Sequence, residues 1–229
     1  MLTRLAAITS LFLTWGVVTQ DQPIHTSIKL LFVGQYHSEE ISAKSGEVWY
    51  GLYKTDAGYE LKSTKLKVEP TVNNELMDIE VSTDQKTRPL FLVKGSDRFR
   101  PGRVPTSFYG REFIFPAQSK DLRFGSDHFF SLNAYGEVTD GQTDTWIKKY
   151  ELKLFHGGET QIVVSIPFFT MEAPPSLIWA GDIDGDGMLD ILFDLGGHYN
   201  VSQPTLFLSS MADGGDFVTK VAELRRVGC

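Results

Sequence analysis

The residues of this sequence whose types and spacing could support a chemistry are aspartates gathered in one short segment. In the run DIDGDGMLD, which begins at Asp182, aspartate takes positions 1, 3, 5 and 9. Calcium binds about six to eight hard oxygen ligands, mostly carboxylates and carbonyls, and tolerates irregular geometry. The pattern therefore predicts a calcium site built from four carboxylates and one backbone carbonyl, those of Asp182, Asp184, Asp186 and Asp190 and of Met188.

Two other interpretations compete with a calcium loop between strands. An EF-hand requires a bidentate glutamate at position 12, and Phe193 stands there. The flanking runs 176–180 and 191–195 are short and apolar, unlike the long amphipathic helices of an EF-hand, so the loop is expected to join two strands. The second interpretation, which stays open, is an acidic turn that binds cations weakly or not at all.

The composition favours an all-β protein. The chain has 229 residues, 41% of them hydrophobic and 12% aromatic, with 21 glycines and 10 prolines. Such a chain can build its own core, and this mixture is typical of many strands joined by turns. We expect an antiparallel meander arranged as a sandwich or barrel. It would form one large domain, or two subregions divided near 95–111, where the sequence is rich in Gly, Pro and Arg.

Alternation of apolar and polar residues indicates the individual strands. Strands are expected at 25–34, 47–53, 59–68, 76–82, 89–94, 146–155 and 161–168. Two hairpins are expected among them, the first from 47–53 and 59–68 and the second from 146–155 and 161–168. The pair Gly157-Gly158 would close the second hairpin, and residues 217–224 fit either a strand or a short helix.

The N-terminal segment indicates export. Residues 1–20 place Arg4 before an apolar run of about a dozen residues, which is typical of a secretory signal peptide. This run is too short to span a bilayer, so we expect residues 21–229 to be a periplasmic or secreted region without a membrane span. Cys229 is the one cysteine and has no partner for an internal disulfide, and a net charge of −7 disfavours nucleic acid as a partner.

The segment 176–195, SLIWAGDIDGDGMLDILFDL, resembles the calcium-binding segment of FG-GAP/VCBS-type repeats, which are found in integrin-type β-propellers and in many secreted bacterial proteins. The resemblance implies that the four aspartates supply side-chain ligands and that Met188 supplies its carbonyl. The segment occurs once and lacks the Phe-Gly and Gly-Ala-Pro elements of the family, so a complete propeller is not expected. The whole chain is also similar to exported bacterial proteins with a comparable Asp loop and a terminal Gly-Cys, which implies no particular activity.

The glycine-containing segment after the Asp loop is the best candidate for a recognition surface. Its side chains suit hydrogen bonding and stacking, and they are those of His198, Tyr199, Asn200 and Gln203. The alternative is a polar loop whose side chains cap the neighbouring backbone. Four arginines earlier in the chain have two interpretations as well, an anion-binding edge or a solvated basic loop, and they are Arg98, Arg100, Arg103 and Arg111.

Motifs of common enzymes are missing from the sequence. It contains no G-x-S-x-G turn, no H-E-x-x-H pair and no phosphate-binding glycine loop. A zinc site would have to be assembled from the dispersed His128, His156 and His198. We therefore expect a binding or interaction protein with a structural calcium ion and a protein or carbohydrate ligand. The alternative is an exported hydrolase with a dispersed active site.

Overall fold

A computed structural model of the chain describes residues 27–71, 77–124, 128–141 and 145–228. Within these ranges the chain forms strands and turns and no helix, which confirms the all-β prediction. None of the described segments is a helix with the length and apolarity that crossing a membrane requires. The expected signal peptide at 1–20 and Cys229 lie outside the described residues.

The strands follow one another along the whole described chain. In order they are β1 (Lys29–Leu31), β2 (Gly34–Tyr36), β3 (Val48–Thr55), β4 (Gly58–Pro70), β5 (Ile79–Thr83), β6 (Phe91–Lys94), β7 (Gly102–Arg103), β8 (Thr106–Glu112), β9 (Ser119–Phe124), β10 (His128–Asp140), β11 (Thr145–His156), β12 (Glu159–Thr170), β13 (Ser176–Gly181), β14 (Asp190–Asp194), β15 (Val201–Ser202), β16 (Pro204–Leu208), β17 (Thr219–Glu223) and β18 (Arg226–Val227). Their pairings in the described residues are antiparallel.

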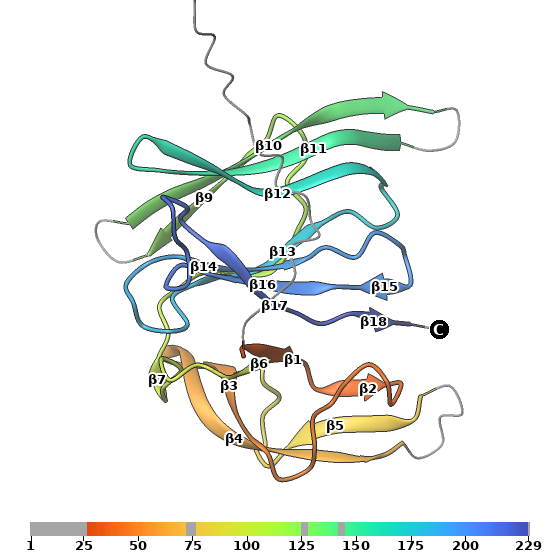
Figure 1. Ribbon diagram of the computed structural model, residues 1–229, viewed down its shortest axis with the longest axis vertical. Coiled ribbons are helices and arrows are strands. Elements are labelled where there is room, and N and C mark those ends of the chain that lie inside the picture. The colour runs from red at the N-terminus through yellow and green to blue at the C-terminus, as the bar shows by residue number, and fades with distance from the viewer. Residues whose placement is uncertain (1–26, 72–76, 125–127, 142–144, 229) are drawn as a thin grey trace, which may run out of the picture.

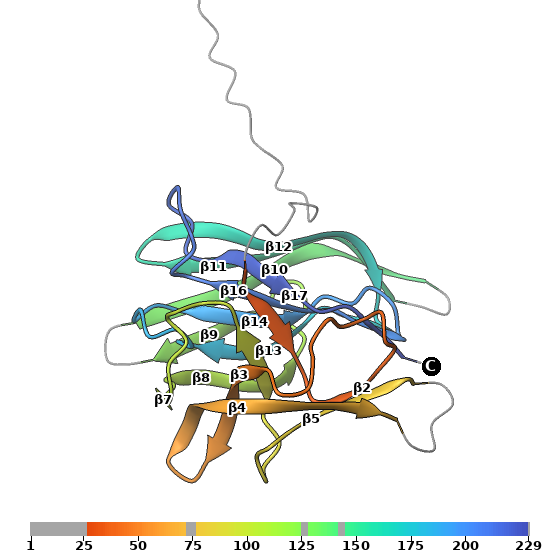
Figure 2. The same ribbon diagram turned by 60° about the horizontal axis from the view of Figure 1, so that its bottom comes forward.

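Three sheets are stacked so that one lies between the other two (Figure 1). One outer sheet has the order β1-β6-β3-β4-β5-β2, with β7 paired to β4, and it curls into a half-barrel (Figure 2). The middle sheet has the order β17-β16-β14-β13-β8, and the second outer sheet is the meander β12-β11-β10-β9. Strands β15 and β18 form a separate short pair. The expected antiparallel architecture, with barrel-like curvature and a meander, is confirmed.

The three central strands of the middle sheet are buried on both faces, because each outer sheet packs a hydrophobic core against them. Ile178 and Leu192 face the core shared with the seven-stranded sheet, whereas Ile191 and Phe193 face the core shared with the four-stranded sheet. Neighbouring residues on a strand point to opposite faces. Every residue of β13, β14 and β16 is therefore buried, which explains why their sequences are largely continuous apolar runs without alternation.

Both expected hairpins are confirmed, since β3 pairs with β4 and β11 pairs with β12. In the second hairpin His156 lies opposite Glu159, which leaves a two-residue turn at Gly157 and Gly158. Their φ angles are +59° and +89°, a region that favours glycine and suits the twist of a hairpin. The segment 217–224, expected as strand or short helix, contains the strand β17.

Two other expected segments differ from the structure. The strand expected at 25–34 is interrupted after β1, where the Tyr36 hydroxyl accepts a hydrogen bond from the N–H of Phe32 and donates one to its carbonyl. These bonds satisfy Phe32 outside a sheet, so the chain can turn from the β6 edge to the β5 edge. The glycine- and proline-rich region 95–111 contains β7 and most of β8, which belong to different sheets. The division into two subregions stays a prediction.

Adjacent residues of β14 provide a test of the three-layer arrangement. We expect Leu192→Ala and Phe193→Ala each to lower the free energy of unfolding by about 2–5 kcal/mol, because each leaves a cavity in a different core. If one face of the middle sheet were open to solvent, one of the two replacements would cost less than about 0.5 kcal/mol. Urea unfolding measures both effects, and Phe168→Ala is the control because Phe168 on β12 is 43% exposed.

Candidate metal centre

The Asp loop connects β13 to β14, two paired strands of the middle sheet. Their register places Gly181 opposite Asp190, so the loop 182–189 begins and ends at the same end of this pair of strands. Gly185 and Gly187 have φ angles of +74° and +85°, which side chains disfavour, and they allow the chain to coil sharply between the aspartates. The expected strand-loop-strand arrangement is confirmed.

Three of the four loop aspartates come together. Asp182, Asp184 and Asp190 each present a carboxylate oxygen within 4.8 Å of the others, and the three residues are 6%, 6% and 0% exposed. Oxygen atoms on opposite sides of a calcium ion lie about 5 Å apart, so one ion can contact all three carboxylates. Within the described ranges, no group containing histidine meets the same geometric requirement for holding a metal ion.

Backbone amides of the loop orient two of these carboxylates. Asp182 accepts hydrogen bonds from the N–H groups of Gly185, at 2.7 Å, and Gly187, at 3.0 Å. Asp190 accepts a hydrogen bond from the N–H of Ile183 at 2.8 Å. Each bond joins two parts of the same short loop, so the coil of the backbone fixes where these carboxylates point.

Two serines beyond the end of β16 also donate to the group. Ser209 donates its N–H to Oδ1 of Asp190 at 2.9 Å and its hydroxyl to the same oxygen at 3.0 Å, and the Ser210 hydroxyl donates to Oδ2 of Asp184. The antiparallel pairing of β14 with β16 brings them there. Sequence reasoning missed both serines, because their position depends on a pairing between distant segments. The local signal was a Ser-Ser pair directly after an apolar strand.

The other carboxylate oxygen of Asp184 has no such donor. Oδ1 is buried and has no hydrogen-bond partner in the described structure. Buried polar atoms without any partner are rare in native proteins, and they call for a specific explanation such as an ion. This oxygen belongs to the carboxylate group that could hold a metal ion.

Asp186 and Met188, the other expected ligands, lie outside the group of three. Asp186 accepts a hydrogen bond from the Met188 N–H at 2.8 Å, and its Oδ2 lies 2.9 Å from the Ser209 hydroxyl, whose one hydrogen it shares with Asp190. The Met188 side chain packs against the core beneath the four-stranded sheet. Metal binding by the Asp186 carboxylate or by the Met188 carbonyl stays a prediction.

Burial raises the pKa of the carboxyl groups of Asp182 and Asp184, and it raises the pKa of Asp190 well above its usual range. Repulsion acts in the same direction, since the charges of Asp186 and Asp182 raise the pKa of Asp184 and the charge of Asp184 raises the pKa of Asp190. The hydrogen bonds lower these pKa values without offsetting the rise. A divalent cation would counteract this rise, because it stabilises the charged carboxylates directly.

The expected recognition loop follows β14 at the end opposite to Asp190, and Asp194 holds it in place. The carboxylate of Asp194 accepts four hydrogen bonds, from the N–H groups of Gly196 and Gln203, the Ser202 hydroxyl and the Arg111 guanidinium, at 3.2, 2.7, 2.9 and 2.8 Å. Burial raises the pKa of Asp194, but these donors outweigh burial and the pKa is lowered. Sequence reasoning missed this residue because its donors come from both sides of the loop and from β8.

Three of the four expected recognition residues lie together. The His198 Nδ1 lies 2.5 Å from the Asn200 Oδ1, and the rings of His198 and Tyr199 are 4.4 Å apart. Tyr199 is 74% exposed. Gln203 is separated from them, because its side chain donates a hydrogen bond to Glu223 at 3.1 Å and lines a different pocket.

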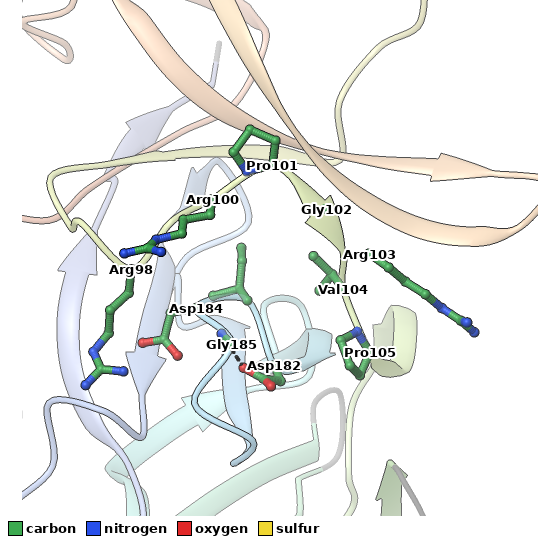
Figure 3. A pocket seen from close by; sticks show the side chains of 11 residues that line it. Arg98, Arg100, Pro101, Gly102, Arg103, Val104, Pro105, Asp182, Asp184 and Gly185 are labelled. Atoms are coloured by element: carbon green, nitrogen blue, oxygen red, sulfur yellow. Dashed lines mark hydrogen bonds between the residues drawn. The ribbon is translucent and has the colours of Figure 1, made fainter.

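The four arginines lie at two separate pockets. Arg111 forms an ion pair with Asp194 and lines a pocket with Tyr199 and Asn200. The other three line a separate pocket of about 340 Å³, together with Asp182 and Asp184 of the metal loop, and they are Arg98, Arg100 and Arg103 (Figure 3).

No family model, curated protein or solved structure matches this chain. The likeness to FG-GAP/VCBS repeats therefore rests on the segment 176–195. The described residues form an all-β protein with a buried aspartate group that could hold a metal ion, and these two properties are the basis for assigning a function.

Replacing Asp194 tests how this carboxylate holds the recognition loop. We expect Asp194→Asn to lower the free energy of unfolding near pH 7 by about 1.5–3 kcal/mol, the value of a hydrogen bond to a charged group. Because the folded-state pKa of Asp194 is lowered, its contribution is present above the unfolded-state pKa and is lost as the pH falls through the folded-state pKa. The difference between parent and variant should therefore shrink on acidification.

Urea unfolding at a series of pH values from neutral to acidic measures this difference. The exposed Asp121 on β9 supplies the control variant, Asp121→Asn, which should change stability little at any pH. Arg111 stays charged over this range, and Glu40, which lines the same pocket, is present in all three proteins. A difference for Asp194→Asn that is constant or grows towards acid pH would contradict the assigned role.

Proposed function

We propose that this chain is an exported β protein whose Asp loop binds Ca²⁺ as a structural ion and whose surface binds a protein or carbohydrate ligand. The observation that carries the calcium assignment is Oδ1 of Asp184, a buried carboxylate oxygen without a hydrogen-bond partner beside two other buried carboxylates. A cation held between Asp182, Asp184 and Asp190 supplies the missing partner.

The charge of the group supports a cation as well. The ion pairs that the described residues form include none of these three carboxylates. Their donors are backbone amides and serine hydroxyls, which carry no charge. An uncompensated buried charge costs several kcal/mol, so neighbouring buried carboxylates favour a bound divalent ion.

The chemistry of the ligand atoms favours calcium over other metals. Every candidate ligand in the group is a carboxylate oxygen, and the nearby Ser209 and Ser210 add hydroxyl oxygens. Zinc sites in proteins use mainly nitrogen and sulfur ligands. Magnesium requires near-ideal octahedral geometry and retains several waters, whereas calcium accepts the irregular set that a coiled loop provides.

A structural role fits the position of the loop. Asp182, Asp184 and Asp190 join the ends of β13 and β14, and the two serines connect the group to β16, so one ion would tie three strands of the middle sheet together. An ion that binds the folded chain and not the unfolded chain stabilises the fold by linkage.

A ligand-binding role is supported by the surface around Tyr199. This exposed side chain and Asn200 line a pocket of about 430 Å³ that also contains Arg111 and Arg226. An exposed tyrosine offers a flat apolar ring and a hydroxyl, which suit a sugar ring or an aromatic side chain of a partner. The composition of residues 1–20 supports a periplasmic or secreted location for this binding.

Calcium should stabilise the parent protein against thermal unfolding. At a calcium concentration about 100-fold above Kd, linkage predicts about 2.7 kcal/mol, or a rise in Tm of about 5–10 °C for a chain of this size. Asp184→Asn should abolish this rise. With chelator present the same variant should be at least as stable as the parent, because it removes a buried and repelled negative charge.

Differential scanning calorimetry with calcium, with magnesium and with chelator makes these comparisons. Asp121→Asn removes one exposed carboxylate of the same type and should keep the full calcium response. A parent Tm that does not change with calcium would contradict the assignment of the Asp loop as a calcium site. An equal rise in Tm with magnesium would contradict the choice of calcium as the metal.

Export can be tested on the full chain in a bacterial host. We expect the protein in the periplasmic fraction with a shortened N-terminus, as measured by mass spectrometry of the intact protein. Leu11→Arg/Leu13→Arg interrupts the apolar run and should retain the chain in the cytoplasm, whereas Thr3→Arg adds a charge before the run and should not. Exported material that still carries Met1 would count against a cleaved signal peptide.

A further inference from the structure

The pocket beside the metal loop has one acidic wall and one basic wall. Asp182, Asp184 and Gly185 line one side of its volume of about 340 Å³, and residues 98 and 100–105 line the other. This volume is at the lower end of the range for small-molecule sites. A cation held by the loop would therefore lie next to a pocket large enough for a small ligand.

The basic wall is fixed to the metal loop through the backbone. The N–H of Asp182 donates a hydrogen bond to the carbonyl of Pro105 at 2.9 Å. The two segments approach so closely here that a Cβ on Gly181 would lie 2.3 Å from the same carbonyl oxygen. Further along the segment, Gly102 and Arg103 pair with β4. The wall is thus held at a fixed distance from the first aspartate of the loop.

Two arginines of this wall lie on the side of the pocket where Asp184 is found (Figure 3). Phe99 is 1% exposed and is anchored in the core of the seven-stranded sheet, so its neighbours Arg98 and Arg100 are both exposed. Figure 3 shows their side chains on the same side of the pocket as the carboxylate of Asp184, while Arg103 extends to the opposite side. The buried phenylalanine fixes the backbone between the two arginines.

The guanidinium groups of this pair are available to a ligand. The ion pairs of the described residues include neither Arg98 nor Arg100. The Arg100 Nε donates one long hydrogen bond, 3.4 Å, to the Asp97 carbonyl. The four loop carboxylates with a divalent ion leave two negative charges, which the three arginines lining the pocket exceed, so the filled metal site and the arginines together favour an anion.

We propose that this pocket binds the oxyanion group of a small ligand, a phosphate, sulfate or carboxylate, between the metal ion of the Asp loop and the guanidinium groups of Arg98 and Arg100. The inference rests on the proposed calcium site. Calcium needs about six to eight oxygen ligands, more than three carboxylates supply as single ligands, so an oxyanion can complete its coordination. Arginine guanidinium groups bind such oxyanions with paired, charge-assisted hydrogen bonds.

Isothermal titration calorimetry on the full chain tests the proposal in two steps. Calcium is titrated first, and a failure to bind calcium would contradict both the proposed calcium site and this inference. The calcium-loaded protein is then titrated with inorganic sulfate, glucose 6-phosphate, glucuronate and glucose. We expect at least one anionic probe to bind about tenfold or more tightly than glucose, and chelator to weaken that binding.

Matched variants locate the binding site. Arg98→Gln/Arg100→Gln should weaken anion binding by about tenfold or more and leave calcium binding in place. Lys148→Gln/Arg225→Gln removes the same charge from two exposed residues that do not line the pocket, and it should change anion binding by less than about twofold. Calcium binding without any preference for the anions over glucose overturns the inference and leaves the calcium site standing. Equal losses in the two double variants also overturn it.

Discussion

Burial of the central strands of the middle sheet on both faces is the constraint on which the rest of the structure depends. Strand β14 has no side open to water, since Leu192 packs into one core and Phe193 into the other. The strand nevertheless begins with Asp190 and ends with Asp194, which are 0% and 6% exposed. A carboxylate withdrawn from water needs hydrogen bonds or a positive charge close by. Both ends of one strand therefore demand compensation from their surroundings.

The buried carboxylates at the two ends of β14 are stabilised in different ways. At Asp194 the compensation comes entirely from the protein, with four donors that include the Arg111 guanidinium, and the pKa is lowered. At Asp190 the donors are neutral amide and hydroxyl groups, two further carboxylates lie within 4.8 Å, and the pKa is raised. Residue type and burial are nearly the same at the two ends. The difference lies in the missing positive charge, which is the physical argument for an ion at one end.

Sequence reasoning reached the features that depend on neighbours along the chain. The hairpin closed at Gly157-Gly158, the strand-loop-strand course of the Asp loop and the apolar runs of the middle sheet follow from local patterns. The stacking of three sheets and the contributions of Ser209 and Asp194 did not follow, because they arise from contacts between distant segments. Spacing also implied four equivalent aspartates. In the structure three of them bring carboxylate oxygens within 4.8 Å of one another, and Asp186 lies beside this group, where it contacts the same Ser209 hydroxyl as Asp190.

The position of the Asp group allows one ion to act both in the fold and at a ligand site. Asp190 lies at the deep side of the group, where β14 and the serines after β16 enclose it. Asp182 and Asp184 lie on the shallow side and line the pocket. An ion bound to all three would have protein behind it and a pocket in front of it. The close approach of Pro105 to Gly181 belongs to the pairing of β8 with β13, so the contact that completes the middle sheet also places the arginines beside the loop. Stabilisation of the sheet and recognition of an anion would then depend on the same backbone geometry.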